Sequence, residues 1–143
     1  MKLSSLLLAT IFAVAIIAVL LMVLGVNFHP PLPAHGAALY NPANEVLVKG
    51  VVAEVRDFAC PVSDGEMGSH LMLNTAEGVV TVHLAPGRIL RSQEIAFAPG
   101  DPITVVGSKV RIQGSSDIIA REITRGNELF VMRDHDGKLM LVQ

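Results

Sequence analysis

The sequence predicts an all-β domain that closes on itself as a small barrel, preceded by one apolar segment. From residue 45 onward, short runs rich in valine and isoleucine follow one another. Several runs alternate apolar and polar residues, which is the period of a half-buried β-strand. Glycine, proline and aspartate separate the runs as turn signals, and only one stretch between them suits a short helix. This order of elements indicates a small β-barrel.

Residues 6–26 form an uncharged apolar segment before that domain. The segment is as long as the roughly 20 apolar residues that span a bilayer as a helix. The apolar part of a signal peptide is shorter, about 7–15 residues. We therefore expect an uncleaved membrane anchor, with a cleaved signal peptide as the alternative. Lys2 is the only charged side chain before the segment, and the positive-inside rule then predicts that residues 1–5 are cytoplasmic.

The rest of the chain divides into a stalk and a folded domain. Residues 27–44 contain Pro30, Pro31 and Pro33, and closely spaced prolines resist helix formation and stiffen a linker. Residues 45–143 make one domain. The sequence thus predicts a single-pass inner-membrane protein whose folded domain is periplasmic or otherwise extracytoplasmic.

The charge pattern excludes a nucleic-acid partner. The chain has 11 basic and 13 acidic residues and few aromatic ones. A nucleic-acid binder would normally show a basic stripe with stacking aromatic side chains. Cys60 is the only cysteine, so no disulfide can form within the chain and the fold must depend on its core.

The first strand is predicted over residues 46–58, with Gly50 near its middle. A glycine inside a strand often marks a bulge or bend, which a small barrel needs where one strand joins two parts of the sheet. A loop over 59–69 follows. Residues 70–75 and 79–84 then form a hairpin around the turn Ala76-Glu77-Gly78.

Alternation fixes the register of this hairpin. One apolar face results only if Leu71 lies opposite Val82 and Leu73 lies opposite Val80, because a slip of one residue would place apolar side chains opposite polar positions. In that register His70 lies directly opposite His83 on the outer face. Directly opposed Cβ atoms are about 4.5–5.5 Å apart, so the two imidazoles should be neighbours.

The remaining elements complete the expected barrel. A short helix is predicted over 88–95 with Ile89 and Leu90 facing inward, followed by a turn at 99–102. Strands are predicted over 103–113 and 117–124. A final hairpin over 128–133 and 138–142 would be closed by the turn Asp134-His135-Asp136-Gly137. The order is that of an OB-fold-like five-stranded Greek-key barrel, with a short helix between strands 3 and 4 and an extra C-terminal hairpin. A meander sandwich is the alternative.

Two stretches carry a family resemblance, HLMLNTAEGVVTVHLAP from His70 and APGDPITVVGSKVRIQGSSDIIAREI from Ala98. Over about residues 45–135 the chain resembles small membrane-anchored bacterial OB-fold proteins of undefined role. The anchored architecture is also similar to the periplasmic haem chaperone of cytochrome c maturation. That family attaches haem through a histidine in an H-D-E-N-Y motif. Around His135 this chain reads RDHDG, without the asparagine and tyrosine, so we do not expect haem.

The candidate site lies on the predicted hairpin. OB folds usually bind ligands on the face of strands 2 and 3 and at the loop between strands 1 and 2. That face offers His70, Met72 and His83, and the loop offers Cys60. Thiolate, thioether and imidazole suit Cu(I), and thiolate with imidazole also suits zinc. The alternative is that the histidines are ordinary solvent-facing residues and that Cys60 is a small buried apolar one.

These observations favour a non-catalytic protein. The chain has no nucleophile motif such as G-x-S-x-G, so we expect no enzymatic activity and no resident cofactor. The expected function is a membrane-anchored binding or scaffolding module for another envelope protein, with oligomeric state undetermined. The alternative is a copper or zinc handling protein with a site at His70 and His83. The mixed charges of Arg121, Glu122, Arg125 and Arg133 are expected to form a solvated surface.

Overall fold

A computed structural model describes residues 10–16, 39–63 and 65–141. The expected membrane segment 6–26 falls largely outside these residues, as does most of the expected stalk 27–44. Residues 1–5, which were expected to be cytoplasmic, lie entirely outside them. Within the segment, residues 10–16 are helical. In the part of the chain that is described, no helix has both the length and the apolar character needed to cross a membrane.

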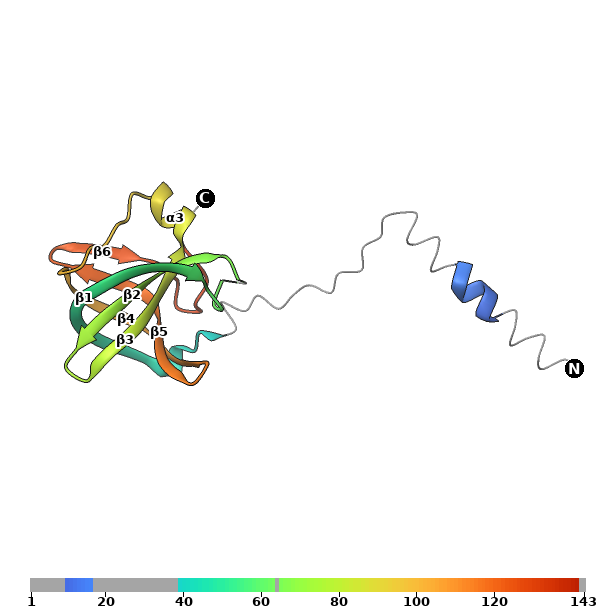
Figure 1. Cartoon of the computed structure of the whole chain (residues 1–143), viewed down its shortest axis with the longest axis horizontal. Helices are drawn as coiled ribbons and strands as arrows, with labels where there is room; N and C mark the ends of the chain where they lie inside the picture. The colour runs from blue at the N-terminus through green and yellow to red at the C-terminus, as the bar shows by residue number, and fades with distance from the viewer. Residues whose placement is uncertain (1–9, 17–38, 64, 142–143) are drawn as a thin grey trace, which may run out of the picture. The chain divides into compact units, whose positions relative to one another are not determined.

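The domain consists of six strands, one short α-helix and one 3-10 turn (Figure 1). In chain order these are η1 (Pro42–Asn44), β1 (Glu45–Ala59), β2 (Met67–Thr75), β3 (Gly78–Pro86), α3 (Gly87–Ser92), β4 (Pro102–Ile112), β5 (Ser115–Arg125) and β6 (Glu128–Val131).

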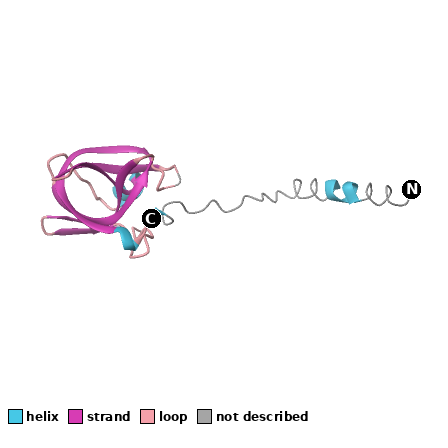
Figure 2. Cartoon of the chain, turned by 90° about the horizontal axis from the view of Figure 1, so that it is seen from below, coloured by secondary structure: helices cyan, strands magenta, loops and turns pink. Residues whose placement is uncertain are grey.

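Five of the strands close into a ring, which Figure 2 shows in end-on view. The hydrogen-bonded order is β3-β2-β1-β4-β5-β6, and an additional parallel pairing of β3 with β5 closes the ring. All other pairings are antiparallel. The closed five-stranded arrangement and the helix after the third strand are OB-fold-like, as the sequence predicted.

β1 joins the two parts of the ring because it bends. Its first half pairs with β4 and its second half with β2, and the register shifts between Val52 and Glu54. Gly50 lies where the two pairings meet. A Cβ atom at Gly50 would lie 2.4 Å from the carbonyl oxygen of Asn74, so only glycine allows the strands to approach this closely. The sequence predicted a bulge or bend at Gly50, whereas the register shift lies just beyond it, between Val52 and Glu54.

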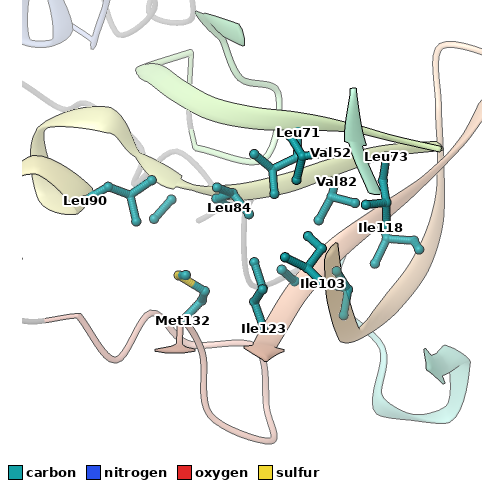
Figure 3. Close-up of a cluster of buried hydrophobic side chains, with 13 residues drawn as sticks. Val52, Leu71, Leu73, Val82, Leu84, Leu90, Ile103, Ile118, Ile123 and Met132 are labelled. Atoms are coloured by element: carbon teal, nitrogen blue, oxygen red, sulfur yellow. The ribbon is translucent and has the colours of Figure 1, made fainter. Parts of the chain in front are cut away.

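The core lies inside the ring (Figure 3). Leu71 and Leu73 from β2 meet Val82 from β3 and Ile123 from β5, and all four are fully buried. Leu90 of α3 also belongs to this cluster and lies at one edge of it in Figure 3. The predicted inward face of the hairpin and the inward orientation of the helix are therefore confirmed.

The predicted C-terminal hairpin is confirmed in part. The segment from Glu128 pairs with β5 around a turn at Gly126, whose φ of 58° suits glycine. Beyond β6, the predicted turn at 134–137 does form. The amides of Asp134 and Met140 donate to the carbonyls of Lys138 and Met132 at 2.9 Å each, and Arg133 and Leu139 form an antiparallel bridge. The arms of this turn pair over fewer residues than expected, and Glu128–Val131 is instead the sixth strand of the sheet.

Candidate metal centre

The histidine pair has the predicted register. His70 of β2 pairs with His83 of β3, Leu71 pairs with Val82, and Met72 pairs with Thr81. The two rings meet edge to face, with centroids 4.8 Å apart. Since Leu71 and Val82 belong to the interior cluster, strand alternation directs both histidines to the outer side of the barrel wall.

The expectation of solvent-facing histidines is wrong. His70 and His83 are 0% and 2% exposed. A second buried cluster of Tyr40, Cys60, Val62 and Ile119 lies apart from the interior core. Ile119 pairs with His83 across the β3–β5 contact, and Cys60 and Val62 come from the loop between β1 and β2. This loop therefore covers the outer face at the histidine pair.

Backbone hydrogen bonds of the loop hold Cys60 in place. The amide of Cys60 donates to the carbonyl of Glu66 at 2.9 Å, and the carbonyl of Cys60 accepts from the amides of Ser63 and Gly65 at 3.1 Å each. Gly68 leaves the space that the cysteine occupies. A Cβ atom at Gly68 would lie 2.6 Å from Cys60 Cβ and 3.3 Å from its sulfur.

Three metal-ligand donors converge under this loop. One donor atom from each of Cys60, His70 and His83 lies within 4.8 Å of the other two. The sulfur of Cys60 is 3.3 Å from Nδ1 of His83. Cys60 is only 3% exposed, so its sulfur is buried together with the two histidines.

Asp117, at the start of β5, orients His83. Its Oδ2 lies 2.9 Å from Nε2 of His83, and its other oxygen accepts from the hydroxyl of Ser115. A carboxylate only accepts hydrogen bonds, so Nε2 carries the proton and Nδ1 presents its lone pair toward Cys60. Histidine ligands of metals commonly have such a carboxylate on the opposite nitrogen. Burial lowers the pKa of His83, although Asp117 acts in the opposite direction.

His70 has no comparable partner. Both of its ring nitrogens are buried without a hydrogen bond in the described part of the chain. The ring of Phe58 stacks on it, with centroids 3.6 Å apart and planes inclined by 7°. Burial and the nearby His83 lower the pKa of His70 to about 4, while backbone groups of Arg56 and Gly68 oppose this without making hydrogen bonds of good geometry. The imidazole is therefore neutral at neutral pH, which is the form that binds metals.

Arg133 brings a positive charge to the same region. It is 5% exposed, and its guanidinium donates to the carbonyl oxygens of Leu84 and Ala120. Burial lowers the pKa of Arg133 to about 10, while the charges of Cys60 and Tyr40 oppose this change. Arg133 is therefore a cation at neutral pH. The expectation of a solvated Arg133 is wrong because the chain after β6 turns back over the barrel wall.

A pocket of about 360 Å³ reaches this group of residues. It lies between the end of β1, the loop after it and the β4–β5 hairpin, and both His83 and Asp117 line it. This is where OB folds bind ligands, between the loops that follow strands 1 and 4. A pocket of about 390 Å³ elsewhere on the domain shares no residue with the Cys/His/His cluster.

Comparison with known proteins decides the family. The model of the MamS/MamX magnetosome protein family matches residues 45–130. The chain belongs to the MamS/MamX magnetosome protein family. No curated protein sequence matches it at a significant level. The matched residues hold the whole Cys/His/His cluster with Asp117, whereas Arg133 lies just beyond them.

Two solved structures with low sequence identity are similar to this MamS/MamX-family domain. One belongs to the S. pombe Stn1-ten1 complex, with 15% identity and a TM-score of 0.46, and the similarity covers 59% of each chain. The other is the OBody AM1L10 bound to hen egg-white lysozyme, with 21% identity and a TM-score of 0.43, covering 70% of this chain and 99% of that one.

For this MamS/MamX-family member, the sequence named three of the residues that the fold brings together, Cys60, His70 and His83. Met72, the fourth predicted ligand, is partly buried and lies two residue pairs further along the hairpin. Sequence reasoning missed Phe58, Asp117 and Arg133 as neighbours of the site. The parallel β3–β5 pairing that closes an OB-type barrel was the available signal for Asp117, because it brings the start of β5 alongside His83.

Proposed function

We propose that this domain is a transition-metal-binding module of the MamS/MamX family, with Cys60, His70 and His83 as its ligands. The observation that carries the proposal is the buried, unpaired His70 ring beside a cysteine and a second histidine. Leaving a buried polar group without a hydrogen bond costs about 1–3 kcal/mol, and apolar packing alone gives no reason to retain two such nitrogens. Metal coordination would satisfy a nitrogen of the ring.

The donor chemistry indicates the kind of metal. A thiolate with two imidazoles suits copper or zinc. Asp117 supports the proposal because it directs the Nδ1 lone pair of His83 toward Cys60. The pocket beside His83 and Asp117 would give a metal ion a route from solvent.

Cys60, His83 and Asp117 also have the order of nucleophile, base and orienting acid found in cysteine hydrolases. We propose a non-catalytic role because the sulfur is buried. The pocket that reaches His83 and Asp117 is not lined by Cys60, so a substrate in that pocket would not contact the sulfur.

The family name supports an association with the magnetosome membrane. We propose that residues 6–26 anchor the chain there and that the metal site lies on the extracytoplasmic side. Binding or scaffolding of another membrane-associated protein stays a prediction in addition to the proposed metal binding.

The proposal is tested by titrating the reduced full chain, in detergent, with Cu(I) and Zn(II). We expect one tightly bound ion per chain, and loss of that binding when His70→Ala and His83→Ala are combined. His135→Ala is the matched control, because His135 lies exposed in the turn at 134–137. Cys60→Ser provides a second ligand variant if the double variant does not fold. Absence of binding, or binding that all these variants retain, would refute the proposal.

A further inference from the structure

The charges around the site are few and buried. Asp117 and Arg133 are each 5% exposed. Asp117 carries the negative charge that contacts His83. Arg133 is held beside the site by hydrogen bonds to neutral carbonyl oxygens, that of Leu84, the chain neighbour of His83, and that of Ala120 in β5. From this position its charge acts on Cys60 and His83. Asp57 also acts on His70, but its side chain is 47% exposed, so solvent screens its charge.

These charges determine which cation the site can hold. Metal binding requires Cys60 as a thiolate and both histidines as neutral imidazoles. The thiolate and Asp117 then contribute two negative charges, and Arg133 contributes one positive charge. A monovalent cation brings the summed charge of the cation, Cys60, Asp117 and Arg133 to zero. A divalent cation leaves one positive charge uncompensated. An unpaired buried charge is costly in a medium of low dielectric constant.

The number of ligands also favours monovalent copper over zinc. Among the described His, Cys, Asp and Glu side chains, only Cys60, His70 and His83 converge here. A structural zinc site almost always has four ligands. A thiolate with two imidazoles suits Cu(I).

We propose that the site selects monovalent copper over divalent ions, and that Arg133 sets this selectivity by neutralising one of the two buried negative charges. This inference rests on the proposed metal-binding function and names its metal. Arg133 is a positioning charge and not a ligand. Its removal should therefore change the preference between ions more than the ability to bind them.

The test compares affinities for Cu(I), Zn(II) and Fe(II) in the reduced full chain, by competition against chelators of known affinity. Wild type should prefer Cu(I). Arg133→Gln should reduce the ratio of Cu(I) to Zn(II) affinity by at least about tenfold. It removes a positive charge, so the net charge of the site becomes one unit more negative, which favours a divalent ion. Arg133→Lys should keep the wild-type ratio.

Arg125→Gln is the matched control, because it removes the same charge from an ion-paired arginine of β5 that contacts Asp101 and Glu128. Its ratio should equal that of wild type. If Arg133→Gln does not fold, Asp117→Asn replaces it and should change the ratio in the opposite direction, toward Cu(I). Equal effects on both ions, or a wild-type preference for a divalent ion, would overturn the copper assignment alone. Absence of binding to any of the three metals would overturn the proposed function itself.

Discussion

The sulfur of Cys60 lies 3.3 Å from Nδ1 of His83, although 23 residues separate them in the chain. The loop after β1 brings the cysteine over the outer face of the β2–β3 hairpin, and Asp117 holds the opposite nitrogen of the histidine at 2.9 Å. His70 completes the group without a hydrogen bond of its own. The three donor side chains thus lie together, and Asp117 orients His83 with its Nδ1 toward the cysteine.

Gly68→Ala should displace the cysteine from the histidines. The new methyl group would lie 2.6 Å from Cys60 Cβ, which is closer than real contacts allow, so the loop must move. We expect metal affinity to fall by about tenfold or more, since ligand misplacement is costly. Chelator competition measures this effect. Gly87→Ala is the control, because the one tight contact of its methyl group would be with the flexible end of Arg91 at 3.1 Å. Equal affinities in both variants would contradict the proposed position of Cys60.

Asp117→Asn should weaken metal binding while the fold is retained. The carboxylate stabilises the tautomer of His83 that presents Nδ1 toward Cys60. Loss of such a partner typically lowers metal affinity by about 10–100-fold. Asp101→Asn removes a carboxylate that pairs with Arg125 instead and should leave affinity unchanged. The orienting role of Asp117 would be wrong if both variants bound metal as wild type does.

Phe58→Ala should speed the release of metal to a chelator. Phe58 stacks on His70 at 3.6 Å and is 37% exposed, so it separates the ligand from solvent. Removing it opens this side of the site, and stopped-flow transfer to an excess of chelator should become faster. Phe97→Ala, at the aromatic pair with Phe130, provides the control. An unchanged release rate would show that metal leaves by another route.

The metal-free protein should lose stability on mild acidification. The pKa of His70 falls from 6.5 in the unfolded chain to about 4 in the fold, so the unfolded state binds more protons between these values. Stability is therefore fully present above pH 6.5 and declines as the pH falls toward 4, by on the order of 3 kcal/mol. Burial also lowers the pKa of His83, which adds in the same direction.

Urea unfolding of the metal-free chain across this pH range measures the effect. His70→Leu should show a clearly smaller decline between pH 6.5 and 4.5. A wild-type stability that stays constant over that window would contradict the buried, neutral state of His70.

The sequence predicted the features that depend on residues close together in the chain. Alternation of Leu71 and Leu73 with polar neighbours was sufficient to pair His70 with His83, because a strand has only two faces. Ile89 and Leu90 identified the inward face of α3. Each of these depends on residues close together in the chain.

The burial of the site depends on contacts between segments that are distant in the chain, so it could not be predicted from local alternation. His70 is buried because the loop from Cys60 to Glu66 and the ring of Phe58 cover it. Asp117 lies beside His83 because β5 pairs with β3 where the barrel closes. Arg133 lies near the site because the chain after β6 turns back over the barrel wall. The same dependence explains why Glu128–Val131, the first arm of the expected C-terminal hairpin, pairs with β5.

The most direct test of the account is an X-ray absorption spectrum of the full chain loaded with one equivalent of Cu(I). The account predicts one thiolate sulfur and two imidazole nitrogens around the copper, with the thiolate signal lost in Cys60→Ser and one imidazole lost in His70→Ala. A spectrum without a thiolate sulfur, or one that is the same in wild type and both variants, would contradict the assignment of Cys60, His70 and His83 as a metal centre.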